Sequence, residues 1–457
     1  MDVKRVVART EAFLKGMVFD CRSCGQCVLD KTGLICPMTC PKGLRNGPCG
    51  GTLEGRCEVL PDKECVWVRI HERTAPGSLS APPLLASPDS ALFHTSSYLN
   101  RMTGIDRQAR SALPALGLPP RRRQLPLQTD SGFERALKSG AFIRTCEVRS
   151  PREADFSALR AEVARLKDHF DAINATAYLN GRPSLPSART AAELKRLGVE
   201  PIVQSTCRDH TKTTFVAELV NNSLNDVHNV LCLTGDSYAG TPKIKQVFDM
   251  DAALMLYEAR HLREAGRIHF TDAPMAAPPR PFLGAAINPF TTPHNIPIRR
   301  LQQKIAAGAD FIQTQLIFDL DRFAEFMRTC CEQGIDQEVF ILAGIPVLTS
   351  KKVSDMLAHI PGIHFPEAVA RRFRASHDIR SFGVEWARST VEAVRTLPGV
   401  SGVHLMLMGS DHGVLPEIVT GLGAPAARAA DAAATAPRHG DRPMRAAARD
   451  AINVQPV

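Results

Sequence analysis

Apolar runs and amphipathic stretches alternate along residues 131–424 of this chain. Each apolar run has the length of a strand that is buried in a sheet. The stretches between the runs, such as residues 151–170 and 187–198, repeat apolar residues at helical spacing. The pattern predicts strands at residues 142–148, 172–177, 201–206, 229–235, 282–288, 311–318, 339–347 and 403–408.

This alternation predicts an α/β fold, and its number of strand–helix units matches a (β/α)8 TIM barrel. A doubly wound open sheet is the alternative. The barrel is favoured because no Gly-rich dinucleotide-binding turn follows an early strand.

The rest of the chain divides into three zones by composition. Residues 1–72 form a Cys-rich module with a short leading helix, and residues 73–130 are rich in Pro, Ser and Leu. We expect the latter to be an extended connector that packs along a larger domain and carries one short helix. Residues 425–457 are rich in Ala, Arg and Pro, and this low complexity predicts a disordered tail.

Composition narrows the class of protein. The chain has 457 residues, 44% apolar and 23% charged, which is typical of a globular protein with two or three folded units. A net charge of +9 would suit a nucleic-acid-binding protein. However, the arginines are spread along the chain and aromatic residues make up only 6%. We therefore expect no nucleic-acid partner; the charge also suits a polyanionic ligand such as a polyglutamylated cofactor.

We also expect no membrane partner and a cytoplasmic location. No apolar run approaches the roughly 18 residues that a membrane span needs. The first residues are amphipathic and lack the apolar core of a secretory signal.

Eight of the 13 cysteines lie within a short N-terminal stretch. In a cytoplasmic protein such a cluster indicates metal binding more strongly than disulfides. The first three have the close spacing of a four-iron cluster site, and the same spacing fits one edge of a zinc site. An iron–sulfur cluster, zinc, or both remain open, and a module of this size needs such a centre to fold. The eight candidate ligands are Cys21, Cys24, Cys27, Cys36, Cys40, Cys49, Cys57 and Cys65.

Polar residues stand at the ends of several predicted strands. In a TIM barrel these ends surround one mouth, where barrel enzymes carry out their chemistry. Several polar residues gathered at one mouth are hard to explain by packing, because unpaired buried carboxylates are costly. The residues are Glu147, Thr176, Thr206, Asp236, Asn288 and Gln315.

Several stretches of the predicted barrel resemble the flavin-dependent methylenetetrahydrofolate reductase family. They are "TCEVRSP", "STCRDHTK", "LTGD", "GAAINP", "KIAAGADFIQTQLIFD" and "LAGIPV", and they follow the family order. The N-terminal "DKTGLICP" and "NGPCGG" are similar to a small Cys-rich domain that is attached to, or partnered with, some of these reductases.

The resemblance implies a reaction and a role for each site residue. The family reduces 5,10-methylenetetrahydrofolate to 5-methyltetrahydrofolate with hydride from a reduced flavin. Glu147 matches the acid that protonates N10, Asp236 the residue that contacts the pterin, and Gln315 a folate contact. By position, the flavin candidates are Thr176, Gln204, Thr206, Asn288, His294 and Lys304.

Structural explanations compete with these roles. Glu147 could pair with Arg144 or Arg149, and Asp236 could cap the helix that follows its strand. Lys304 could be an ordinary solvent-facing lysine, and His294 a loop residue with no role.

Three departures from the family pattern leave FMN open as an alternative to FAD. Thr234 replaces an arginine before the Gly-Asp pair, Gln204 replaces a histidine, and the last strand lacks the usual following Asn-Arg. The function expected is the reductase or the reverse oxidation, with tetrahydrofolate as substrate and NAD(P)H or a redox protein as electron donor. The alternatives are a folate-binding electron-transfer or assembly subunit and a pterin-dependent methyltransferase. An oligomer is expected.

Overall fold

The computed structural model describes residues 3–114, 123, 125–238, 244–357, 360, 362–409, 411–423 and 425–426. Nearly all of the tail that was predicted to be disordered lies outside these residues. Within the described chain, no helix is both long and apolar enough to cross a membrane.

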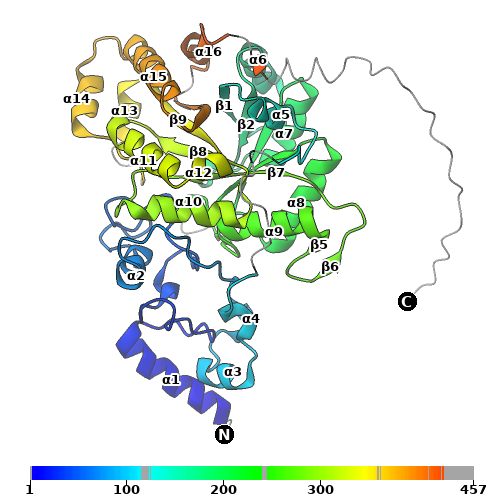
Figure 1. Cartoon of the computed structure of the whole chain (residues 1–457), viewed down its shortest axis with the longest axis vertical. Coiled ribbons are helices and arrows are strands. Elements are labelled where there is room, and N and C mark those ends of the chain that lie inside the picture. Colours follow the sequence, from blue (N-terminus) through cyan, green and yellow to red (C-terminus); the bar gives the residue numbers. More distant parts are fainter. Residues whose placement is uncertain are drawn as a thin grey trace, which may run out of the picture.

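Eight parallel strands close into a barrel in the order β1-β10-β9-β8-β7-β4-β3-β2. Each strand falls on one of the predicted apolar runs, so the prediction of a (β/α)8 barrel is confirmed (Figure 1). The strands are β1 (Ile143–Arg149), β2 (Ala172–Thr176), β3 (Pro201–Thr206), β4 (Asn229–Leu233), β7 (Phe282–Ile287), β8 (Phe311–Leu316), β9 (Phe340–Leu348) and β10 (Val400–Met408).

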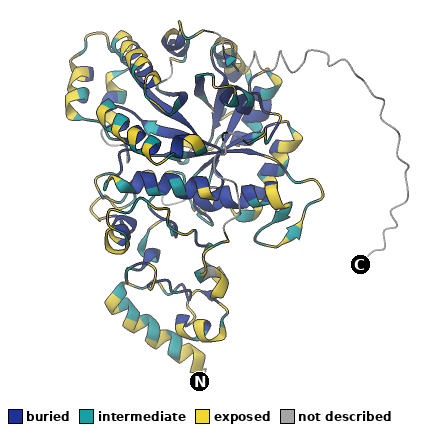
Figure 2. Ribbon diagram, viewed as in Figure 1, coloured by how far each residue is buried: buried dark blue, intermediate teal, exposed yellow. Residues whose placement is uncertain are grey.

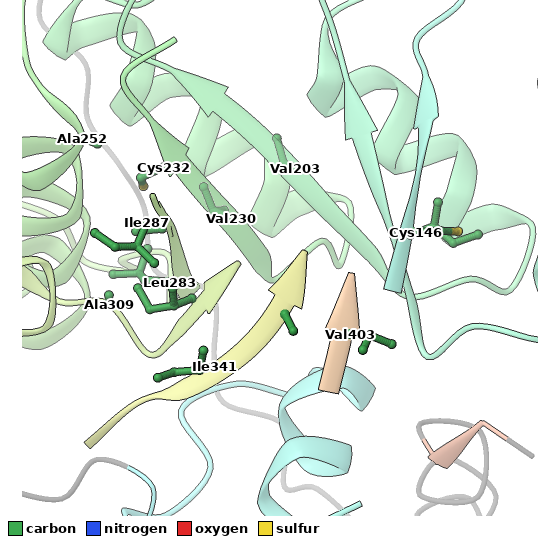
Figure 3. Close-up of a cluster of buried hydrophobic side chains, with 14 of the residues drawn as sticks. Cys146, Val203, Val230, Cys232, Ala252, Leu283, Ile287, Ala309, Ile341 and Val403 are labelled. Atoms are coloured by element: carbon green, nitrogen blue, oxygen red, sulfur yellow. The ribbon is translucent and has the colours of Figure 1, made fainter. Parts of the chain in front are cut away.

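Helices surround the barrel and cover its outward-facing apolar side chains. Figure 3 shows part of this buried layer, including Cys146, Val203 and Ile341 from three different strands. The helices are α6 (Ser157–Leu166), α7 (Ser187–Arg196), α8 (Lys212–Leu224), α9 (Ala252–Ala265), α10 (Asn295–Ala307), α11 (Leu320–Glu332), α12 (Ile335–Glu338), α13 (Lys351–Leu357), α14 (Glu367–Ala375), α15 (Ile379–Arg395) and α16 (Val414–Val419). A small antiparallel pair, β5 (Arg267–Ile268) and β6 (Ala273–Pro274), was not predicted.

Helix α5 (Gly132–Lys138) closes the end of the barrel where the strands begin. Its Phe133 is fully buried and packs edge-on against the rings of Phe282 and Phe311, which begin β7 and β8. Since this end is filled by aromatic packing, a site must open at the other end, where the strands finish.

The N-terminal residues form a separate layer against the barrel (Figure 1). This module contains α1 (Val3–Phe19), η1 (Pro37–Thr39) and α2 (Val66–Thr74). Helix α1 has no buried residue, and Figure 2 shows it as mostly exposed or half-buried.

Part of the predicted connector folds back onto the module instead of running along the barrel. It carries η2 (Ser90–Leu92), α3 (Ser97–Thr103) and α4 (Arg107–Arg110). The Gln26 side chain donates to the Asp89 carbonyl at 2.7 Å and accepts from the Asp89 N–H at 2.8 Å. Asn100 Nδ2 donates to the Gly25 carbonyl at 2.9 Å. The sequence-based boundary at residue 72 therefore separates segments that pack together.

Candidate active site at the barrel mouth

A cavity of about 310 Å³ opens where the barrel strands end. Of the residues proposed from sequence, it is lined by Glu147, Gln204, Thr206, Asp236, Asn288, Lys304 and Gln315. Two others do not line it. Thr176 is buried and its hydroxyl donates to the Val148 carbonyl at 3.3 Å, while His294 is exposed at the start of α10.

Glu147 lies inside the mouth on β1, with 28% of its side chain open to the cavity. Burial raises the pKa of this carboxyl, and a hydrogen bond from Gln204 Nε2 at 3.4 Å only partly opposes that effect. The competing salt bridges do not form, because Arg144 pairs with Asp171 and Arg149 donates to the Gly409 carbonyl. Glu147 is therefore suited to hold a proton at a higher pH than a free glutamic acid.

His404 on β10 faces Glu147, with His404 Nε2 4.0 Å from Glu147 Oε2. The Thr145 hydroxyl donates to the Val403 carbonyl, so it accepts from His404 Nδ1 at 2.9 Å. This assigns the hydrogen to Nδ1 and leaves the Nε2 lone pair toward Glu147. Burial lowers the pKa of His404 to about 3, which keeps the ring neutral. The sequence analysis missed His404; its signal is a polar residue inside the apolar run at 403–408.

Asp236 lies in the loop after β4 and is exposed toward the cavity. Desolvation by the surrounding protein and the nearby Glu58 carboxylate raise the pKa of Asp236. The positive charges of Lys42 and Arg208 lower it. The helix that follows begins at Ala252, and its N-cap is Asp251. Asp236 therefore does not cap that helix, and its carboxylate is available to a ligand.

The module supplies part of the cavity wall, including Lys42, Cys49 and Glu58. Lys42 Nζ forms a buried ion pair with Glu58 at 2.6 Å and donates to the Gly235 carbonyl at 2.9 Å. Glu58 also accepts from the Ser237 N–H at 2.8 Å. One buried pair of module residues thus holds the chain on both sides of Asp236, a role that the sequence analysis missed.

Arg208 supports the same loop from the barrel. Its Nη1 donates to the Asp236 carbonyl at 3.1 Å. Gly235 has a φ of +83°, and a Cβ there would lie 2.9 Å from the Arg208 Cβ. The glycine of "LTGD" is therefore required both by the left-handed backbone and by the close approach of Arg208.

Asn288, Gln315 and Thr206 differ in how many of their polar side-chain atoms already bond to the protein. Asn288 Nδ2 donates to the Gly50 and Gly362 carbonyls at 2.9 and 2.7 Å, so its amide joins the module to the barrel. Gln315 Oε1 accepts from the Leu316 N–H at 3.0 Å, which leaves its NH2 to face the cavity. The Thr206 hydroxyl donates to Asp209.

Lys304 is buried, in contrast to the solvent-facing alternative. Its ammonium donates to the Ala286 carbonyl. Burial, together with the charge of Arg300, lowers the pKa of Lys304 to about 7. A bound anion would favour the charged form of this lysine.

The eight N-terminal cysteines separate into two sets. The first set, Cys21, Cys24, Cys27 and Cys36, lines a cavity of about 30 Å³ beside α1. The second set, Cys40, Cys49, Cys57 and Cys65, lines a cavity of about 400 Å³ that lies closer to the barrel. All eight are free thiols. Within the described chain, no three acidic, His or Cys side chains are close enough to ligate a metal as they stand.

Comparison with known proteins identifies the family. A family model described as "Methylenetetrahydrofolate reductase" matches residues 132–423. A second, described as "Methylene-tetrahydrofolate reductase C terminal", matches residues 2–80, which here form the N-terminal module.

Over the matched stretches, named relatives are about one quarter identical to this chain. A probable NADPH methylenetetrahydrofolate reductase of Caenorhabditis elegans is 25% identical over 241 residues, covering 52% of this chain and 34% of that protein. The 5,10-methylenetetrahydrofolate reductase of Escherichia coli K12 is 25% identical over 183 residues, covering 40% and 56%. The matches thus span only one third to just over one half of these relatives.

One solved structure, an uncharacterized protein from Clostridium thermocellum whose description states that it binds two copies of 5-methyl-5,6,7,8-tetrahydrofolic acid, superposes with a TM-score of 0.46. It is 14% identical, and the match covers 65% of this chain and 98% of that one. An overlap this loose bears on neither fold nor ligand. The family model over residues 132–423 covers well over half of the sequence, and on that ground the chain belongs to the methylenetetrahydrofolate reductase family.

Proposed function

We propose that this chain interconverts 5,10-methylenetetrahydrofolate and 5-methyltetrahydrofolate with a bound flavin. The observation that carries the proposal is the position of Glu147, an acid with a raised pKa, in one cavity with Asp236 and Gln315. A folate-binding electron-transfer subunit would have less need of a buried acid beside the substrate site, and the flavin measurement below separates the reductase from a pterin-dependent methyltransferase.

The chemistry of the cavity fits a flavin. Gln204 and Gln315 offer amide groups for the polar edge of the ring, and Lys304 offers a buried cation for a phosphate. When bound, the flavin supplies the hydride acceptor or donor of the reaction. Thr206 is a further contact, whereas Thr176 and His294 would need the chain to move. Asn288 serves the cofactor indirectly, by fixing Gly50 over the mouth. FAD and FMN both remain compatible with this set.

Glu147 carries the proton in this proposal. Reduction requires the imidazolidine ring of the substrate to open, which protonation at N10 assists. A protonated Glu147 can donate that proton, and in the reverse direction its carboxylate takes it back. His404 stays neutral and presents its Nε2 lone pair to the carboxyl, so it can accept a hydrogen bond from the protonated acid.

Asp236 and Gln315 orient the substrate. The pterin has an amino group and ring N–H donors, which a carboxylate can accept in a bidentate way. The Gln315 amide, whose NH2 faces the cavity, can bind a pterin oxygen or nitrogen. The loop that carries Asp236 is fixed from the module by Lys42 and from the barrel by Arg208.

Each cysteine set is proposed to hold one metal centre, an iron–sulfur cluster or zinc. Four thiols line each cavity, which is the number that either centre uses. The sulfurs would have to move together to ligate a metal, and the bound metal would supply folding free energy that the module lacks. Cys49 lines both the second cavity and the barrel mouth, so an electron-carrying centre there would lie beside the flavin.

The partners are proposed on the same basis. NAD(P)H or a redox protein would donate electrons, and no feature of the described residues decides between them. A cytoplasmic location and an oligomeric state remain expectations.

The decisive experiment follows the flavin directly. Protein purified under anaerobic conditions should show flavin absorption bands that bleach on reduction. Addition of 5,10-methylenetetrahydrofolate should restore the bands and yield 5-methyltetrahydrofolate in equal amount. Bands that stay bleached despite folate binding would favour the electron-transfer subunit. Methyl transfer without any change in the bands would favour the methyltransferase.

A further inference from the structure

A further cavity, of about 100 Å³, lies between the module and α10. Its wall combines apolar side chains, such as Trp67 and Ile70, with five basic residues. No aspartate or glutamate belongs to the wall. The basic residues are Lys31, Arg45, His71, Arg299 and Arg300.

Hydrogen-bond donors in this wall lack acceptors. Arg45 is 3% exposed and His71 is 9% exposed. Arg45 Nε and Nη1 and His71 Nε2 are buried atoms that find no hydrogen-bond partner among the residues that the structure describes. Because a buried donor without an acceptor loses its water and gains nothing, native structures rarely leave three in one place.

The state of His71 follows from its neighbour. Arg299 donates to His71 Nδ1, so the ring hydrogen is on Nε2, the atom without a partner. Asn295 lies beside the ring but does not meet it at hydrogen-bond geometry. Burial lowers the pKa of His71. His71 therefore adds a neutral N–H donor to a wall that is otherwise cationic.

We propose that this cavity binds an anion with a phosphate or carboxylate group, held by Arg45, His71 and Arg299. Such a group supplies several acceptor oxygens together with the negative charge that the wall lacks. Arg45 would also interact with Cys24, Cys27 and Cys36 in their thiolate form, so it is shared with the first cysteine set. Arg299 and His71 have no such second role, and the test therefore rests on Arg299.

The position of the cavity suggests two sources for the anion. Pro48, Ile296 and Arg300 line both this cavity and the barrel mouth, so the two spaces adjoin. The anion is either a free small ion or the charged end of a molecule bound in the mouth. In the second case, which rests on the proposed function, the glutamate tail of the folate has the required carboxylates.

Inorganic phosphate tests the site without any catalytic activity. At constant ionic strength, phosphate should raise the melting temperature of the full-length protein above its value in chloride. Arg299→Gln should weaken phosphate binding roughly tenfold, as expected for the loss of a charged hydrogen bond, and Arg299→Lys should restore part of it. The matched control is Arg371→Gln on α14, which removes the same charge from an exposed position. It should respond to phosphate as the unmodified protein does.

Folates of different tail length separate the two sources. If the tail binds here, triglutamyl substrate should have a lower KM than monoglutamyl substrate, and Arg299→Gln should remove that difference. Phosphate binding without dependence on tail length identifies a free anion. If neither phosphate nor tail length has an effect, the proposal is wrong. Absence of reductase activity would contradict the proposed function, while the phosphate measurement would still decide this site.

Discussion

The buried ion pair between Lys42 and Glu58 provides a direct test of how the module shapes the mouth. Both side chains are almost inaccessible, at 3% and 4% exposure, and their charged atoms are 2.6 Å apart. Lys42→Met would leave the Glu58 carboxylate buried with only the Ser237 N–H and the Cys49 thiol as donors. It would also free the Gly235 carbonyl from its bond to the module.

The expected loss of stability in Lys42→Met follows from the burial of the ion pair. Removing one partner of a buried ion pair costs about 3–5 kcal/mol, because the other charge stays desolvated. A surface pair is worth about 0–1 kcal/mol. Arg374 and Glu367 form such a pair at 2.9 Å, with 45% and 66% exposure, so Arg374→Met is the matched control. Lys42→Met/Glu58→Gln removes both charges and should recover most of the loss.

Two measurements check this prediction. Urea unfolding should show a loss of several kcal/mol for Lys42→Met and a small one for Arg374→Met. The KM for the folate should rise about tenfold or more in Lys42→Met, since a displaced Asp236 loop misplaces the substrate. Metal content must be equal in all variants, because Lys42 and Glu58 are close to cysteines in the sequence. If Lys42→Met behaves like Arg374→Met in both assays, the pair does not hold the mouth.

Other substitutions test single residues. Glu147→Gln should bind and reduce flavin but lose folate reduction by on the order of a hundredfold, because an amide cannot give up a proton. Since burial raises the pKa of Glu147, the folate half-reaction should slow as pH rises through that pKa, and an unchanged rate in Glu147→Gln would exclude this acid. His404→Phe removes the acceptor proposed to stabilise the protonated acid and should move this pH profile downward without loss of flavin; an unmoved profile would leave His404 a packing role. Cys24→Ser should release the metal of the first set and leave the folate KM unchanged. Cys57→Ser should release the other metal and also raise that KM; equal effects of the two would contradict the separate placement of the sets.

The barrel could be predicted because its signal is local. Each strand carries its own apolar run, and hydrophobic burial in a parallel sheet requires such a run wherever the strand lies. The strand-end positions of Glu147, Asp236 and Gln315 then follow from the topology, since parallel strands all finish at one mouth. The closing role of Phe133 was not visible, because a helix that plugs the barrel has the same pattern as one that covers it.

Contacts between distant segments could not be predicted in this way. Lys42 and Glu58 are ordinary charged residues in the sequence, and their role depends on meeting Gly235 and Ser237, more than 170 positions away. His294 is a different case. Its position in the sequence suggested a cofactor contact, and the structure places it exposed at the start of α10, outside the lining of the mouth.

These long-range contacts distinguish the two cysteine sets. A chain of contacts runs from the second cysteine set to the substrate loop: Cys49 donates to Glu58 at 3.3 Å, Glu58 pairs with Lys42, and Lys42 holds Gly235. A centre that folds this part of the module would therefore also fix the wall of the mouth. Among the described residues, no such chain of hydrogen bonds joins the first set to Gly235; its cavity is bordered by α1 and by residues near Thr95. On the proposed function, the two sets would therefore differ in role even if they held the same metal. The second would belong to the scaffold of the active site, whereas the first lies beside α1.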